Sequence, residues 1–243
     1  MQENTLISNL LSERSNFILI GLTGRTGSGC STAANLLTDE KLEYPQESQV
    51  NYEKKSYFSG LDKKRYDLVR NYATTNHSSF SLIKISDLIT SQLFNLESPK
   101  FIELLKSIVE NHYLDKIEES EIENKFNEIL ENISQTFPET QKFLCTHEEN
   151  NPDMAHEEDI HAWKEAISAA TIELKNILKN KLGNCYVKLY QHIGDSIRHT
   201  TQIHKNYREQ AFNANGLHII PQMCNKLIKI YRKKIMVQKL ILL

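Results

Sequence analysis

Four of the chain's eight glycines fall within nine residues, from Gly21 to Gly29. Residues 24–32 match the phosphate-binding pattern Gly-x-x-x-x-Gly-Lys-Ser/Thr, except that Cys30 replaces the lysine. They read Gly24-Arg25-Thr26-Gly27-Ser28-Gly29-Cys30-Ser31-Thr32. Glycines let consecutive backbone N–H groups turn toward one centre, and the N-terminus of a following helix adds partial positive charge. We therefore predict that these nine residues cradle phosphate oxygens and that Ser31 reaches a Mg²⁺ ion carried by the nucleotide.

The missing lysine limits the chemistry that this loop can perform. In the full pattern the lysine reaches the β- and γ-phosphates and offsets their charge during phosphoryl transfer. A neutral thiol at Cys30 cannot do this, and the direction of the Arg25 side chain is left open by the sequence. The pattern therefore predicts that a nucleotide is held more readily than its phosphate is transferred.

The segments around the loop have the order strand, loop, helix. The unbroken apolar run 17–23 predicts a strand buried on both faces, as in a parallel sheet, and residues 31–37 predict a helix. A loop over 42–60, a charged helix over 62–72 and a second strand over 80–85 follow. Ser86 and Asp87 are suited to cap the next helix, through Leu93. The apolar end, 235–243, is interpreted as either a terminal strand or a foreign tail.

The rest of the chain is predicted to be helical. Apolar residues recur at helical spacing over 101–109, 122–133 and 163–177, further helices are predicted over 186–198 and 221–234, and the acidic stretch 145–159 is predicted to be rich in turns. We expect a first half of the core at 1–98, an acidic helical insertion at 99–180 and a basic helical return with a terminal strand at 181–243. The predicted fold class is α/β: a P-loop NTPase-like parallel sheet, helix-rich, with a large helical insertion and a sheet left incomplete at the C-terminus.

Composition and charge exclude several classes of protein. The 243 residues are 40% hydrophobic with a net charge of −2, so neither wholesale disorder nor a polycation that binds nucleic acid is expected. Residues 181–243 carry 11 basic against 2 acidic side chains, which predicts either a surface that holds phosphates or, the interpretation we prefer, a solvated helix face. The four cysteines form no Cys-x-x-Cys pair, so no zinc site is expected. Without a signal-like start or a long apolar run, the sequence predicts a cytoplasmic protein that does not enter a membrane.

Three segments resemble known kinases. Residues 20–32 are similar to the start of dephospho-CoA kinases and nucleoside monophosphate kinases, and 83–89 are similar to their second strand, which implies that Asp87 ends a strand and faces the acceptor substrate. Residues 189–198 resemble the Leu-x-Gln-x-x-Gly-x-x-x-Arg segment of phage deoxynucleoside monophosphate kinases. That resemblance implies that Arg198 binds a monophosphate, with Gln191 and Asp195 nearby. An ordinary amphipathic helix with a surface arginine is the alternative.

A narrower resemblance covers these segments together with residues 220–228. They look like the N-terminal P-loop module of proteins that continue into a zinc-dependent deoxycytidylate deaminase, and related fusions belong to anti-phage systems that deplete deoxycytidine nucleotides. A deaminase requires His-x-Glu and Pro-Cys-x-x-Cys, whereas here Trp163 stands two residues after His161 and Cys224 has no partner at that spacing. Deamination by this chain is not expected. We interpret the chain as ending before a deaminase domain, with exposed strand edges that favour self-association.

Three functions remain open from the sequence. The first is a regulatory module that binds a nucleotide or deoxynucleotide and is part of a longer deoxycytidylate deaminase-type protein. The second is a phosphotransferase similar to deoxynucleoside monophosphate kinases, which would need another cation in place of the lysine. The third is a helical interaction protein with a vestigial loop, whose acidic helices over 99–178 contact a partner.

Overall fold

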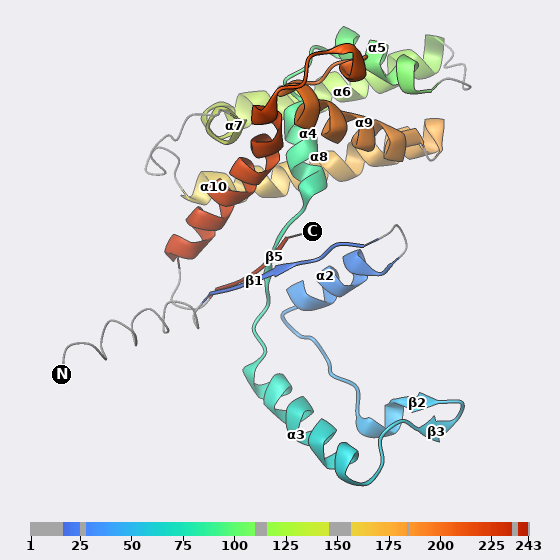
Figure 1. Ribbon diagram of the computed structural model, residues 1–243, viewed down its shortest axis with the longest axis vertical. Helices are drawn as coiled ribbons and strands as arrows, with labels where there is room; N and C mark the ends of the chain where they lie inside the picture. Colours follow the sequence, from blue (N-terminus) through green and yellow to red (C-terminus); the bar gives the residue numbers. More distant parts are fainter. Residues whose placement is uncertain are drawn as a thin grey trace, which may run out of the picture. The chain divides into compact units, whose positions relative to one another are not determined.

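The computed structural model describes residues 17–24, 28–109, 116–145, 157–183, 185–234 and 238–242. The chain divides into two compact units, coloured by sequence in Figure 1. Unit 1 comprises Met1–Ile83 and Ile235–Leu243, and unit 2 comprises Lys84–Lys234. This division differs from the predicted boundaries at 98 and 180, because the helices of the expected insertion share one core with the helices before and after them.

Unit 1 contains a parallel sheet of three short strands in the order β1-β5-β4. In β1 (Phe17–Gly21), Phe17 pairs with Gln238 of β5 (Gln238–Leu242), and Ile83 of β4 (Ser81–Ile83) pairs with Leu242. The apolar end of the chain is therefore a strand, and it lies at the centre of the sheet. The helix-rich character of the predicted fold class is confirmed, whereas the P-loop type of sheet stays a prediction.

The predicted two-sided burial of the first strand is wrong. Ile18 and Leu19 of β1 are 42% and 47% exposed. Helix α2 (Cys30–Thr38) contacts β4, and the N–H of Phe80 donates to the carbonyl of Leu37 at 2.9 Å, but α3 (Gly60–Asn76) buries no residue. A parallel strand is buried on both faces only where helices cover both. Ile18 and Leu19 are adjacent and point to opposite faces, so their exposure shows that neither face of β1 is closely covered at these residues.

The segment between α2 and α3 is more ordered than the predicted loop. It contains the short 3₁₀ helix η1 (Glu47–Gln49) and a hairpin of β2 (Asn51–Tyr52) and β3 (Lys55–Ser56). Glu53 and Lys54 turn this hairpin with φ of +50° and +64°. The segment is attached to α3, because Lys63 forms an ion pair with Glu47 at 2.9 Å and Arg70 donates to the carbonyl of Tyr44 at 3.1 Å.

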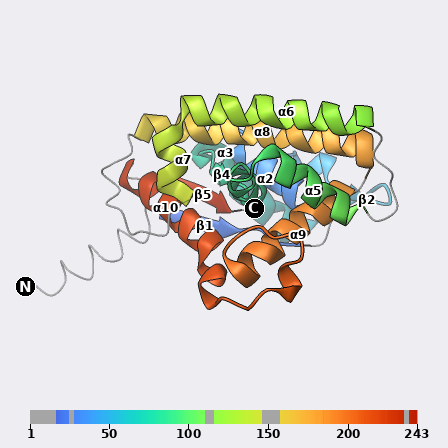
Figure 2. The same ribbon diagram turned by 90° about the horizontal axis from the view of Figure 1, so that it is seen from above.

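Unit 2 is a helical assembly with α4 (Ile85–Leu93) at its centre (Figure 2). The helices that pack on α4 are α7 (Pro138–Cys145), α8 (Glu157–Leu182), α9 (Cys185–Thr200) and α10 (Ile219–Lys234). Helix α5 (Ser98–Ile108) contacts α6 (Lys116–Thr136), which runs beside α8. Two short 3₁₀ helices, η3 (Tyr207–Glu209) and η4 (Ala214–His218), connect α9 to α10.

The predicted apolar stripes form the core of unit 2. Phe101 stacks on Phe126 with ring centroids 4.2 Å apart, and Ile167 is fully buried. The indole Nε1 of Trp163 donates to Oε1 of Gln141 at 3.0 Å, which satisfies its polar atom inside the core. The helices and their buried faces are thus confirmed. Most of the predicted turn-rich stretch, residues 146–156, lies outside the described residues.

Candidate phosphate-binding loop and ligand pocket

The glycine loop (residues 24–32) joins β1 to α2 in unit 1. Gly24 and residues 28–32 are described, whereas Arg25, Thr26 and Gly27 lie outside the described residues. Strand β1 ends at Gly21 and α2 begins at Cys30, so the loop connects a strand to a helix as its pattern requires.

Two of the glycines are required by the conformation of this loop. Gly29 is the N-cap of α2 with φ of +85°, in the left-handed region that favours glycine, and its carbonyl accepts from the N–H of Ala33 at 2.9 Å. A Cβ added at Gly24 would clash with the Ser28 side chain and lie 3.0 Å from Sγ of Cys30. A side chain at Gly24 would therefore meet neighbouring atoms, and one at Gly29 would strain the backbone, so either substitution would change the loop.

The start of α2 is a suitable place for an anion. No side chain caps the helix, and its first turn has no acidic residue. The first N–H groups of a helix have no acceptor within the helix, so those of Cys30, Ser31 and Thr32 are available to a ligand. Ser28, Ser31 and Thr32 are exposed, and the Cys30 thiol lies 3.3 Å from Oγ of Ser28. The arrangement offers donors to phosphate oxygens, but the position of the usual lysine holds a neutral sulfur.

Asp87 does not end a strand, which corrects the expectation from the kinase resemblance. Helix α4 begins at Ile85 with Lys84 as its N-cap, so Asp87 lies in the first helical turn and is 7% exposed. It does not cap the helix either, because Lys84 already occupies the extended cap position. Burial raises the pKa of the Asp87 carboxyl, while Lys84 and the hydroxyl of Thr171 act in the opposite direction.

Three lysines interact electrostatically with the Asp87 carboxylate. Lys84 precedes α4, and Lys164 and Lys175 come from α8. Burial lowers the pKa of both Lys164 and Lys175, and attraction to Asp87 partly offsets that effect. Lys164 also interacts with the Glu165 carboxylate, whereas Asp87 is the one carboxylate that raises the pKa of Lys175 among the described residues.

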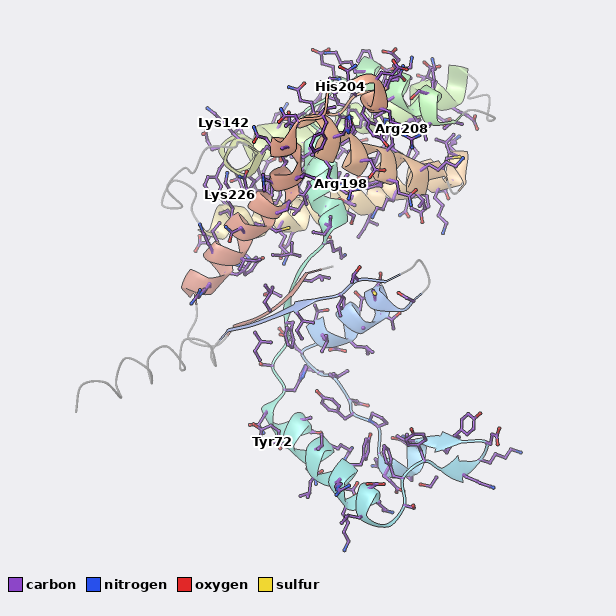
Figure 3. The ribbon with its side chains drawn as sticks, viewed as in Figure 1. Tyr72, Lys142, Arg198, His204, Arg208 and Lys226 are labelled. Atoms are coloured by element: carbon purple, nitrogen blue, oxygen red, sulfur yellow. The ribbon has the colours of Figure 1, made fainter. Side chains whose placement is uncertain are left out.

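The three α9 residues from the kinase resemblance lie together. Gln191, Asp195 and Arg198 line one pocket of about 560 Å³ in unit 2, called here the α9 pocket. Its apolar walls come from α4, α9, η4 and α10, with Ile85, Ile89, Val187, Leu217, Ile220 and Pro221 among them. Arg198, labelled in Figure 3, forms an ion pair with Asp195. Asp87 is not among the lining residues, and the glycine loop belongs to unit 1.

Two further residues of the α9 pocket were missed from the sequence. The ammonium of Lys175 lies 4.8 Å from the centre of the Tyr190 ring, and the Tyr190 hydroxyl is 2.8 Å from Oγ1 of Thr90. Lys175 and Tyr190 both line the pocket. A single lysine beside an apolar stripe is common in amphipathic helices, so the sequence offered no signal that would have selected Lys175.

Metal and membrane features were searched in the described ranges. There, no group of three or more His, Cys, Asp or Glu side chains could hold a metal ion. The helices of those same ranges include none that is both long and apolar enough to span a bilayer. In comparisons with known proteins, the chain matches no protein-family model, no curated protein and no solved structure.

Proposed function

We propose that this chain is a nucleotide-binding module whose glycine loop holds phosphate groups without transferring them efficiently. The observation that carries the proposal is the left-handed Gly29 immediately before α2, in a loop that follows a strand and matches the phosphate-binding pattern at every fixed position but one. Such a loop presents the free N–H groups of a helix to an anion. Ser31 has the position from which a hydroxyl would reach the Mg²⁺ of a bound nucleotide.

The cysteine in the lysine position decides between holding and transferring a phosphate. Backbone N–H groups and the helix dipole remain when the lysine is absent, so binding survives. Transfer needs a cation against the developing charge on the γ-phosphate, and Cys30 supplies none. A regulatory role for the nucleotide, within a deoxycytidylate deaminase-type protein, follows from the sequence resemblance and is part of the proposal.

A second candidate is a phosphotransferase that acts on deoxynucleoside monophosphates. The observation that favours it is the shared pocket of Gln191, Asp195 and Arg198, the residues for which the kinase resemblance implies contact with a monophosphate. This candidate needs a cation from elsewhere to replace the lysine. It ranks second because the position that would provide the transfer cation is occupied by Cys30.

Nucleotide binding is tested by thermal unfolding with a panel of NTPs, dNTPs and dNMPs, with and without Mg²⁺, on the wild type and two glycine variants. Gly29 and Gly60 both lie in unit 1 with positive φ, +85° and +53°, and neither has an atom near the place of a Cβ. Gly29→Ala and Gly60→Ala should each lower stability by about 1 kcal/mol through backbone strain. Only Gly29→Ala should also reduce the upward shift in the unfolding midpoint that a nucleotide produces.

The outcomes separate the candidate functions. A nucleotide shift that falls in Gly29→Ala and persists in Gly60→Ala supports binding at the glycine loop. Release of ADP when a dNMP is supplied as acceptor would instead favour the phosphotransferase. No shift with any nucleotide at millimolar concentration would contradict both candidates, because a ligand that binds the folded state must stabilise it.

A further inference from the structure

Unit 2 contains a pocket that has the features of a small-molecule site independently of the glycine loop. The α9 pocket has a volume of about 560 Å³, within the range of roughly 300–1,000 Å³ of ligand sites, and its walls are mainly apolar. Its lining also includes a few polar and charged residues, among them Lys175, Gln191 and Arg198. This combination of an apolar body with few polar contacts is typical of pockets that bind small organic molecules.

The charge on the pocket is positive once its internal ion pair is counted. Arg198 and Asp195 neutralise each other at one side of the pocket. Lys175 remains, and none of the carboxylates in the described part of the chain forms an ion pair with it. Its ammonium lies over the Tyr190 ring, a weak partner compared with a carboxylate.

The first turn of α4 adds donors on the same pocket. Ile85 and Ser86, the first two residues of α4, line the pocket together with Lys175. Their backbone N–H groups precede the first intrahelical hydrogen bonds, so they have no acceptor in the helix. The positive end of the helix dipole therefore acts on the same space as the Lys175 ammonium.

The surroundings leave Lys175 short of negative charge. Burial is the largest influence on its pKa and lowers it, and attraction to Asp87 does not outweigh that effect. Lys84 adds repulsion. An anion placed against Lys175 would compensate the charge of this half-buried lysine, which no neutral ligand can do.

We propose that the α9 pocket binds an organic anion with a flat, apolar body, and that its acid group lies against Lys175 and the first turn of α4. The rings of Tyr186 and Tyr190 and the side chains of Ile89 and Leu217 provide the apolar surface. This site belongs to unit 2, and its test uses no nucleotide. The acid group is a phosphate or a carboxylate, and the oxygens of either can accept hydrogen bonds from the Lys175 ammonium.

The test uses calorimetric titration with three probes that share one flat ring system: 1-naphthyl phosphate, 1-naphthoate and neutral 1-naphthol. The wild type should bind at least one of the two anions about tenfold more tightly than the neutral probe. A difference in affinity of about tenfold is what one charge-assisted hydrogen bond contributes. The two anions distinguish a phosphate site from a carboxylate site. Lys175→Gln should remove this preference for the anion and leave 1-naphthol within about twofold.

Two further variants make the result specific. Lys179 is one turn further along α8, exposed and outside the pocket, so Lys179→Gln should bind all probes as the wild type does. Gly194 lines the pocket, and a Cβ there would lie 3.6 Å from Cδ1 of Ile89, so the longer side chain of Gly194→Leu must enter the pocket and should abolish binding of every probe.

The proposal is overturned by any of three results. These are a wild type that binds no anionic probe or shows no preference for it, a Lys175→Gln variant that keeps the preference, and a folded Gly194→Leu variant that still binds. Because the probes contain no nucleotide, such a result does not bear on nucleotide binding at the glycine loop. Likewise, failure of Gly29→Ala to reduce nucleotide binding does not bear on the proposal for the α9 pocket.

Discussion

Individual residues of the glycine loop follow from its sequence pattern, whereas the environment of Asp87 does not. Gly29 lies immediately before the helix, where the backbone adopts the left-handed conformation that favours glycine. The local sequence is therefore enough to predict its role. Asp87 is buried by α8, whose Thr171 and Lys175 are more than 80 residues away in the sequence. No local pattern contains that contact. The strand-end position of Asp87 came from the kinase resemblance, whereas the local pattern predicted a helix that starts at Ser86 and Asp87.

The raised pKa of Asp87 makes a prediction about acid stability. Because this pKa in the folded protein lies above the ordinary value of 3.8, the folded state holds the proton more tightly than the unfolded chain does. Acidification toward 3.8 therefore favours folding at this site, and the cost of the buried charge is fully present above the folded-state pKa. The free energy of unfolding of the wild type, relative to Asp87→Asn, should rise between pH 7 and pH 4.

Urea unfolding of the wild type and of Asp87→Asn across this pH range measures the difference between their free energies of unfolding. The other carboxyl groups are common to wild type and variant, so their titration cancels in the comparison. A difference that stays constant, or that falls as the solution is acidified, would show that burial does not control Asp87.

Helices were predicted more fully than strands because helical periodicity is local. The buried stripes of α5, α6 and α8 are visible as spacings of three and four residues, and the structure confirms them. The position of β5 between β1 and β4 depends on pairing with residues more than 150 positions earlier, so the sequence left two interpretations of this segment. The exposure of β1 depends on which helices cover the sheet, which the strand's own residues do not encode.

Two glycines near the α9 pocket should respond oppositely to alanine. Gly194 is inside α9, and a Cβ there would make an ordinary contact with Ile89 at 3.6 Å, so Gly194→Ala should stabilise by about 0.5–1 kcal/mol through helix propensity. At Gly216 a Cβ would lie 2.6 Å from the carbonyl oxygen of Arg198, so Gly216→Ala should destabilise by about 1–3 kcal/mol.

Urea unfolding of these two variants reports whether η4 packs closely against the end of α9. Equal effects of the two substitutions would contradict that packing. A loss of stability in Gly194→Ala would mean that the Ile89 side chain lies too close to Gly194 to make room for a Cβ.

The whole molecule consists of two units, and the predicted phosphate-binding and substrate-binding residues are divided between them. The glycine loop belongs to unit 1, while Asp87 and the α9 residues belong to unit 2. The sequence could not predict this division, because α4 joins unit 2 only through its contacts with helices that come up to 140 residues later. The loop in unit 1 and the α9 pocket in unit 2 are each tested by their own experiment.

The central claim, that the glycine loop binds a nucleotide, is tested most directly by the rate at which iodoacetamide alkylates Cys30. Cys30 and Cys185 are both half-buried, so Cys185 in unit 2 is an internal control. Burial raises the pKa of Cys145 and of Cys224 to about 11, so these thiols should react slowly at pH 8.

The two alkylation rates are followed by mass spectrometry of the peptides that contain Cys30 and Cys185. A nucleotide with Mg²⁺ at ten times its Kd should slow alkylation of Cys30 about tenfold, because the loop is then occupied most of the time, and leave Cys185 unchanged. A Cys30 rate that no NTP, dNTP or dNMP alters at millimolar concentration would contradict the claim.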